Sequence, residues 1–335
     1  MRHIHPDELK ITELAKLLTS AIAPRPIALV ATISENGEPN LAPFSFFNMF
    51  GANPPMVAFS PSIRVRDGSH KDTYHNLVRE KECTIQMVNF DMVGQVNLAS
   101  TEYDTGVNEF IKSGLTPIPS DTVKPPRVKE SPFQMECRLM QEVSLGNGKG
   151  AGNLMICRVE KIHVAEEVFV KDSIDPYRMD LVARMGENYY SRASGNALFE
   201  LDKPSEIKGM GYDKLPEQVK QSHVFTANDL AQLAGAETLP VKKEVKELIE
   251  NIKKDFTFDN EADLLQLFQH YLRMKDHMKM LAVALCLKKR KHILANQKIE
   301  LAAQTALHNN DRHFAWKAIS MNTMFEAKDF ERCGM

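Results

Sequence analysis

The sequence has few cysteines, and no two of them stand at metal-binding spacing. Its five cysteines are dispersed along the chain, and none forms the CxxC pattern of a zinc or redox site. An odd and scattered set also argues against a disulfide framework. These observations predict reduced thiols in a cytoplasmic protein with neither a disulfide scaffold nor a zinc site.

The sequence also has little net charge and no long apolar run. The formal net charge of the 335 residues is −2, which predicts no bulk attraction to nucleic acid or to an anionic membrane. The longest apolar run is Met280–Leu287, far too short to cross a bilayer. The start, MRHIHPDELK, has no apolar core of a secretion signal. We therefore expect neither a nucleic-acid partner nor a membrane partner.

Several motifs of known chemistry are absent or incomplete. There is no HExxH, so the histidines predict no metal site. GNGKGA at 146–151 matches one form of the dinucleotide fingerprint, but a strand-like segment follows where that motif needs a helix. We interpret it as a hairpin turn. The basic run LKKRKH at 287–292 is typical of a solvated helix end, with nucleic-acid binding as the alternative.

The first 200 residues contain short β-type segments separated by turn formers. Segments 27–33 and 41–47 flank Asn36-Gly37, a pair typical of a β-hairpin. Other strands are predicted at 55–61, 83–90, 134–146 and 153–168, and helices at 13–22, 71–81 and 92–101. Residues 103–132 are expected to form a loop-rich excursion. Without βαβ alternation, the pattern predicts a mainly β domain, either a barrel or a sandwich.

From about residue 240 the pattern changes to amphipathic helices. Val245, Leu248 and Ile252 share one helical face, and the run 262–289 repeats that spacing, so we expect two to four helices. The preceding residues are rich in glycine and proline and predict an extended connection. The predicted domains are a β domain at 1–200, this connection at 201–240 and a helical module at 241–335.

The segment 42–61, APFSFFNMFGANPPMVAFSP, contains no charged side chain and three phenylalanines within four residues. The next segment, 60–73, holds hydroxyl and cationic groups ahead of a predicted helix, as a phosphate pocket does. Alone, the second segment could be an ordinary basic loop. Together the two segments suit a ligand with a flat heterocycle at one end and a phosphate at the other, and FMN has that form.

These segments resemble the flavin reductase-like, FMN-binding split-barrel family. The resemblance covers about 18–195 through PRPIALVATIS, PNLAPFSFFN, NPPMVAFSP, KDTYHNL, VNLAST, GVNEFIKSGLTPIPSDTVKPPRVKESPFQMEC, GAGNLMICRVEKIHV and RMGENYYSR. It implies a six-stranded Greek-key barrel with short helices, here followed by a helical module. It also implies a homodimer with FMN near the subunit interface. At MGENYY the chain departs from the commoner Gly-Gly form, which leaves the size and charge of the substrate mouth open.

Carried over position by position, the resemblance implies a set of cofactor-binding residues. The flavin ring is expected to lie against Phe44, Ser45, Phe46, Phe47 and Asn48. The phosphate is expected to contact Ser60, Ser62, Arg64, Lys71 and Thr73, whereas Asp72 suits a helix cap. Asn97 and Ser100 are expected near the ring. Arg25 either anchors the first strand or reaches the cofactor. His163 and Tyr189 either border the open flavin face or serve packing and dimer contacts.

The resemblance implies an FMN-dependent oxidoreductase of the NAD(P)H:flavin reductase type, in which the flavin carries the chemistry and no side chain acts as catalytic acid or base. Its acceptor would be a small molecule or a redox partner protein. Two alternatives stay open. One is a flavoredoxin-like electron carrier that a protein partner reduces. The other is a non-catalytic dimeric interaction protein that binds FMN or uses its barrel as a scaffold.

Overall fold

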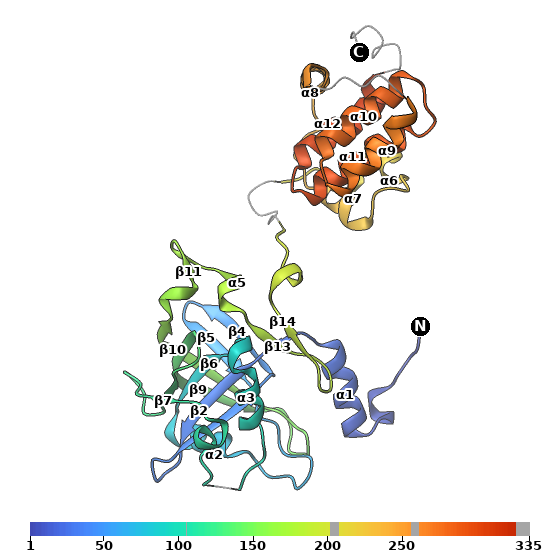
Figure 1. Cartoon of the computed structure of the whole chain (residues 1–335). Coiled ribbons are helices and arrows are strands. Elements are labelled where there is room, and N and C mark those ends of the chain that lie inside the picture. Colours follow the sequence, from blue (N-terminus) through green and yellow to red (C-terminus); the bar gives the residue numbers. More distant parts are fainter. Residues whose placement is uncertain (105, 202–207, 256–260, 326–335) are drawn as a thin grey trace. The chain divides into compact units, whose positions relative to one another are not determined.

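The computed structural model describes residues 1–335 except 105, 202–207, 256–260 and 326–335, and it describes no side chain between 253 and 263. The chain forms two compact units, Met1–Glu200 and Leu201–Met335 (Figure 1). Among the described residues, no helix combines the length and apolar character needed to cross a bilayer.

The first unit is built on a seven-stranded antiparallel sheet. Its strands, in spatial order, are β3 (Pro39–Phe44), β2 (Ala28–Ile33), β6 (Glu82–Met87), β9 (Phe133–Ser144), β10 (Asn153–Val164), β5 (Pro55–Phe59) and β4 (Phe47–Ala52). Smaller sheets join β1 (Arg25–Pro26), β13 (Val182–Arg184) and β14 (Tyr190–Arg192), then β7 (Pro117–Ile118) and β8 (Arg127–Val128), and β11 (Phe169–Val170) and β12 (Ser173–Ile174). The predicted mainly β class is confirmed.

Both faces of the sheet are covered at its inner strand β2. Leu29 and Val30 are neighbours on β2, so their side chains point to opposite faces, and neither is exposed to solvent. Val30 packs in a cluster with Phe59 and Ile85. Leu29 packs in a second cluster with residues of α3 (Val93–Ala99) and α4 (Glu109–Ser113). Strand β2 is therefore an almost continuous apolar run, because it is covered on both faces.

The predicted first hairpin is confirmed, but its second strand is shorter than expected. Strands β2 and β3 pair with Val30 opposite Ala42. Strand β3 ends at Phe44, and a separate edge strand, β4, begins at Phe47. The sequence predicted one strand over 41–47 and no strand at 47–52. The break at Ser45–Phe46 gives the main sheet seven strands where the resemblance implied six.

The turn of this hairpin provides a test of backbone strain. Gly37 has φ +79°, and a Cβ there would meet no atom within 4 Å. Gly37→Ala should therefore destabilise the unit by about 1 kcal/mol through strain alone. Gly94 lies in α3 with equally open space, so Gly94→Ala should stabilise the unit by about 1 kcal/mol. Chemical denaturation measures both, and equal signs for the two variants would contradict this assignment.

The remaining predicted elements of the first unit are present. Strands β9 and β10 form the long second hairpin, and the predicted helices appear as α1 (Ile11–Ala21), α2 (Asp72–Glu80) and α3. Within 103–132 the described residues form only α4, β7 and β8 besides loops. One detail differs, because the N-cap of α2 is Lys71 and no side chain caps that helix. Asp72 is instead the first helical residue. A short helix, α5 (Pro176–Met179), completes the unit.

The second unit is helical, as predicted, but it contains more helices than the two to four expected. They are α6 (Glu217–Lys220), α7 (Ala227–Ala234), α8 (Lys242–Asp255), α9 (Glu261–Arg273), α10 (His277–Lys289), α11 (Ala295–His308) and α12 (Arg312–Met324). The run 262–289 is split because Lys275 adopts a left-handed conformation, and Asp276 caps α10 by accepting from Lys279 N at 3.0 Å.

The expected extended connection at 201–240 is wrong for its described second half. Thr226 and Asp229 form a reciprocal capping box that starts α7. Leu230 and Leu233 then pack in the core of the helical unit. Asp229 is 1% exposed and accepts hydrogen bonds from Gln304 and His308 of α11. The glycines and prolines of this stretch therefore separate short helices instead of preventing them.

Candidate functional site

The two segments predicted to hold opposite ends of one ligand lie side by side. The backbone N–H of Ser60 donates to the Phe46 carbonyl oxygen at 2.9 Å. The Lys71 ammonium lies 5.3 Å from the centroid of the Phe44 ring. This proximity arises because β4 and β5 pair antiparallel, which returns the chain to the break at Ser45–Phe46. The aromatic segment and the cationic loop after it thus form one continuous region.

Two buried polar atoms in this region lack hydrogen-bond partners within the part of the chain that the structure describes. They are Ser60 Oγ and Arg64 Nε. The rest of the Arg64 guanidinium is held in place, because its Nη1 donates to Ser69 Oγ and to the His70 carbonyl. Gly152 approaches closely, since a Cβ there would lie 2.8 Å from Ser60 Oγ. Buried unpartnered donors of this kind are suited to an anionic ligand.

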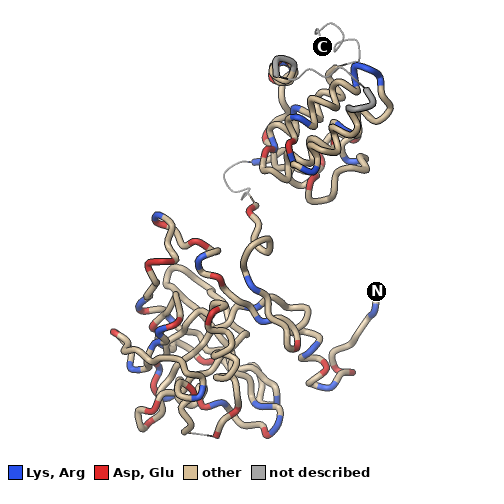
Figure 2. The backbone as a smooth tube through the Cα atoms, in the orientation of Figure 1, with Lys and Arg blue, Asp and Glu red and all other residues tan. Residues whose placement is uncertain are grey.

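Lys71 adds a positive charge next to these atoms. Burial, and to a smaller extent the nearby Arg64 charge, lower the pKa of Lys71 from its ordinary value. An anionic ligand would offset both effects. The first turn of α2 follows directly, and its first N–H groups have no acceptor within the helix. Figure 2 shows that basic and acidic residues are interspersed along the first unit, so this cationic loop is a local feature.

The Thr73 side chain was predicted to contact the phosphate, but it is bonded within the protein. It is 1% exposed, and its hydroxyl donates to Asn40 Oδ1 at 2.9 Å. Its single hydroxyl hydrogen is therefore used within the protein. Only its backbone N–H, in the first turn of α2, stays directed out of the helix end.

The predicted ring-binding residues divide into core and surface groups. Phe44 is buried, with its ring 5.2 Å from that of Phe59, and Phe47 packs against the same cluster. Phe46 is 49% exposed, and the Arg25 guanidinium carbon lies over its ring, 5.9 Å from the centroid. Asn48 is exposed on β4, and its Oδ1 accepts from the neighbouring Met49 N–H at 2.8 Å.

A cavity of about 480 Å³ lies beside Phe46. Helix α1 forms one wall with its apolar side, and the loop after β5 forms another. The lining residues are Ile11, Leu14, Ala15, Leu18, Thr19, Ile22, Arg25, Phe46, Ser62, Ile63, Val65 and Gly150. The cavity therefore joins a predicted ring-binding residue, Phe46, to a predicted phosphate-binding residue, Ser62. Its apolar walls suit a flat aromatic group.

Arg25 makes the contacts of an anchor, and it also lines the cavity beside Phe46, so its second predicted role stays a prediction. Its Nη1 donates to the Ile22 and Thr19 carbonyls at the end of α1, and its Nη2 donates to the Met185 carbonyl at 3.0 Å. Its Nε lies 3.4 Å from Ser45 Oγ. Arginine often satisfies the last carbonyls of a helix in this way. Arg25 therefore holds α1 against the break between β3 and β4.

Replacing Arg25 should loosen α1 without unfolding the sheet. In Arg25→Met the carbonyls at the end of α1 lose their donor, and no residue of α1 is buried enough to hold it alone. We expect amide hydrogen exchange of 11–21 to quicken at least about tenfold, since a charged hydrogen bond contributes about 1.5–3 kcal/mol. Lys16→Met is the control, because Lys16 on the same helix makes only an exposed ion pair with Glu187. Similar exchange in both variants would contradict the anchoring role.

Asn97 and Ser100 lie at the end of α3, and both are exposed. The Ser100 hydroxyl donates to the Asn97 carbonyl at 2.6 Å, which closes the last turn of that helix. Their proposed approach to a flavin ring stays a prediction. The sequence pattern placed them correctly on a helix, but it did not reveal this local hydrogen bond.

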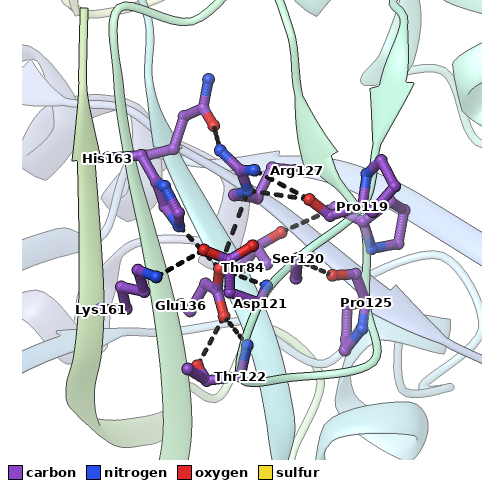
Figure 3. Close-up of polar contacts among 12 residues, drawn as sticks. Thr84, Pro119, Ser120, Asp121, Thr122, Pro125, Arg127, Glu136, Lys161 and His163 are labelled. Atoms are coloured by element: carbon purple, nitrogen blue, oxygen red, sulfur yellow. Dashed lines mark hydrogen bonds and ion pairs between the residues drawn. The ribbon is translucent and has the colours of Figure 1, made fainter.

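His163 follows the packing alternative. It lies on β10, and its Nε2 is 2.7 Å from Oε1 of Glu136, which is fully buried on β9 (Figure 3). Burial alone would raise the pKa of Glu136. Hydrogen bonds from the Asp121 and Thr122 N–H groups, the Thr122 hydroxyl and His163 outweigh that effect and lower this pKa to about 2. His163 thus belongs to a structural network and lines neither cavity of this site.

The same network could be mistaken for a metal centre. Donor atoms of Asp121, Glu136 and His163 lie within 4.8 Å of one another. However, Lys161 Nζ lies 2.5 Å from Asp121 Oδ2, and Arg127 Nε lies 3.8 Å from Glu136 (Figure 3). These cations already balance the carboxylates. We therefore assign the cluster to the stability of the sheet and the loop around 119–127.

Tyr189 lies in the turn between β13 and β14 and is 72% exposed. Neighbouring residues of this turn line a second cavity of about 510 Å³, together with Lys16 of α1 and Arg184. Gly186 is required there, because a Cβ would lie 2.8 Å from Ser20 Cα of α1. The substituted MGENYY segment therefore borders this polar cavity. Tyr189 stays a predicted residue of the substrate mouth.

Sequence reasoning missed the part that α1 plays in the site. Apolar residues at 11, 14, 18 and 22 form a stripe at helical spacing, yet none of the residues of α1 is buried. An amphipathic helix with no obvious core partner was the available signal. The spacing marks the stripe, but only the tertiary structure shows that it faces the cavity beside Phe46.

The first unit is thus an antiparallel β protein with an apolar cavity and a cationic loop at one strand break. Residues 20–177 match the model of the flavin reductase like domain. An uncharacterized protein of Halalkalibacterium halodurans is 35% identical over 204 residues, which are 60% of this chain and 96% of that relative. The chain therefore belongs to the flavin reductase-like family, with an additional C-terminal helical region.

Solved structures agree with this assignment. Nitrilotriacetate monooxygenase component B from Bacillus cereus is 33% identical, with a TM-score of 0.57 over 60% of this chain and 98% of that one. The 2-nitrobenzoate 2-nitroreductase of Pseudomonas fluorescens is 24% identical, with a TM-score of 0.53 over 62% of this chain and 98% of that one, and it shows the fold alone. These comparisons support a flavin-related redox role for the chain.

Proposed function

We propose that the chain binds FMN and acts as an NAD(P)H-dependent flavin reductase. The observation that carries this proposal is a pair of buried polar atoms without a hydrogen bond, Ser60 Oγ and Arg64 Nε, close to an apolar cavity in a flavin reductase-like domain. Groups of this kind are expected where a phosphate is held. The residues present therefore fit the phosphate and ring ends of FMN.

The phosphate end of the site would use charge and hydrogen bonds together. Ser60, Ser62, Arg64 and Lys71 would hold the phosphate with their side chains, and Thr73 would contribute its backbone N–H at the start of α2. Arg64 is already oriented by Ser69 and His70, so little side-chain freedom would be lost on binding. This preorganisation favours a phosphate over a neutral group.

The ring end of the site would use apolar contact and the strand break. Phe46 and the apolar side of α1 would cover a flat ring and exclude water from it. The Phe46 carbonyl is already bonded to Ser60 N–H, so the remaining main-chain groups of 44–48 would serve the polar edge of the ring. Asn97 and Ser100 are proposed to approach from α3, and Tyr189 to border the mouth.

Bound FMN would supply the redox chemistry, taking a hydride from a nicotinamide and passing electrons to a small-molecule acceptor or a redox partner protein. The residues of the chain would orient the flavin and exclude water from it, and none would be required as an acid or a base. This agrees with the site, where the charged side chains are bound to carbonyls or lie at the phosphate end.

The edge strand β4 supports the proposal of a homodimer. Met49 and Phe50 are 60% and 68% exposed on this strand, which has a free edge in the isolated unit. A second copy covering them would also enclose the neighbouring flavin site. Light scattering should therefore give twice the mass of one chain, and a monomer at micromolar concentration would contradict this part of the proposal.

One experiment separates the proposed function from its alternatives. The purified protein is loaded with FMN, freed of excess by gel filtration and treated with NADH or NADPH without oxygen. Rapid bleaching of the flavin absorbance supports the reductase. Retained FMN that neither nucleotide bleaches, but that dithionite does, favours the electron carrier. Failure to retain or bind FMN at all excludes both and leaves the interaction protein.

A further inference from the structure

The proposed phosphate pocket contains an acidic residue from another part of the chain. Glu102 follows α3 and reaches the cationic loop, where its Oε1 lies 3.7 Å from Arg64 Nε and its Oε2 lies 3.4 Å from Arg66 Nη1. Arg64 is largely buried and Glu102 is 46% exposed at their side chains. The carboxylate therefore stands at the same guanidinium nitrogen that has no hydrogen-bond partner.

Glu102 differs from the other acid of this region. Asp67 belongs to the cationic loop itself, where it accepts from Ser69 N–H and Ser69 Oγ and pairs with Arg66. Those bonds shape the loop. Glu102 makes no such contribution to the loop backbone. Its negative charge also opposes the two influences that lower the pKa of Lys71, so its effect reaches the second cation of the pocket.

We propose that Glu102 sets the affinity of the pocket, because its carboxylate competes with the ligand phosphate for Arg64. This inference rests on the proposed function and assigns it one further property, the strength with which FMN is retained. A phosphate monoester carries about 1.5–2 negative charges at neutral pH and can displace a carboxylate that carries one. A ligand without phosphate neither gains nor loses by the competition. Glu102 thus weakens the binding of the phosphorylated flavin and keeps it exchangeable.

The physical basis is charge repulsion at short range. FMN held by Arg64 and Lys71 would place its phosphate close to the Glu102 carboxylate, which weakens binding unless the carboxylate withdraws. Partly exposed ion pairs contribute little to folding, so neutralising Glu102 should leave the protein stable. Its effect should appear in ligand affinity instead.

The test compares three variants by flavin fluorescence titration. Glu102→Gln removes the charge and should bind FMN about three- to tenfold more tightly than the parent protein, with riboflavin affinity unchanged. Glu102→Asp retains the charge and should resemble the parent. Glu250→Gln is the matched control, because Glu250 lies on α8 of the helical unit, is 52% exposed and pairs with Lys246 at 3.7 Å.

The results for the inference and for the proposed function can be told apart. Equal FMN affinity in Glu102→Gln and Glu250→Gln overturns the inference, and so does an equal gain for riboflavin. If the parent protein does not bind FMN, the proposed function is overturned. Thermal stabilisation by inorganic phosphate then decides the inference. A larger stabilisation of Glu102→Gln than of Glu250→Gln supports competition at the pocket, and no difference overturns it.

Discussion

Lys71→Met should weaken FMN binding about 10- to 100-fold, because a hydrogen bond to a charged group contributes about 1.5–3 kcal/mol. Methionine keeps the length and apolar stem of lysine, so the packing beside Phe44 is preserved. The folded protein should not lose stability. The pKa of Lys71 is lowered mainly by burial and then by Arg64, which means that its charge is unfavourable in the ligand-free protein.

Flavin titration and thermal unfolding together check this prediction. Lys81→Met is the control, since Lys81 is exposed at the opposite end of α2 and the substitution removes the same charge. We expect weaker FMN binding only in Lys71→Met, with an unchanged or higher melting temperature. If the two variants bind FMN equally well, the phosphate pocket is located elsewhere.

The second large effect is expected at Glu136, which holds the loop around 119–127 to the sheet (Figure 3). Its buried carboxylate accepts from Asp121 N–H, Thr122 N–H and the Thr122 hydroxyl, and it faces His163. In Glu136→Gln the amide NH₂ must face one of these donors, which leaves buried groups unpaired. We expect a loss of about 3 kcal/mol and a fall in melting temperature of about 6–12 °C.

The pH dependence of stability tests the same residue independently. The folded pKa of Glu136 is about 2, below its ordinary value of 4.5. A depressed carboxyl pKa stabilises the protein above pH 4.5 and loses that contribution as the pH falls toward 2. The stability of Glu136→Gln should therefore decline less steeply over this range. Glu35→Gln, at an exposed turn residue, is the control and should keep the parent profile. Parallel profiles for all three proteins would contradict the role of Glu136.

The order of the elements was predictable because local signals agree with the fold. Asn36-Gly37 specifies the first hairpin turn, and Gly37 adopts the left-handed conformation that this turn requires. Helical spacing at Val245, Leu248 and Ile252 likewise predicted a buried helix face. Where no local signal exists, the prediction was wrong. Apolar character continues through Ser45–Phe46, so nothing in the pattern marked the end of β3 at Phe44 and the start of β4 at Phe47.

The helical unit shows the same limit. Glycines and prolines at 209–240 suggested an extended connection, yet the Thr226–Asp229 capping box starts a helix between them. The capping pattern was present in the sequence, but only its long-range partners explain its stability. Asp229 is buried because Gln304 and His308 satisfy it from a helix about 75 residues further on. Such contacts have no local signature.

By itself, the sequence determined the family, the mainly β class and the two short segments proposed to hold FMN, because spacing and residue type are local properties. Only the tertiary structure decided which side chains of those segments are available. It buries Phe44 and Thr73, leaves Phe46 exposed, leaves Ser60 Oγ and Arg64 Nε buried without a hydrogen bond, and brings α1 and Glu102 to the site. Burial and hydrogen-bond pairing depend on neighbours distant in the chain, so no local pattern can report them.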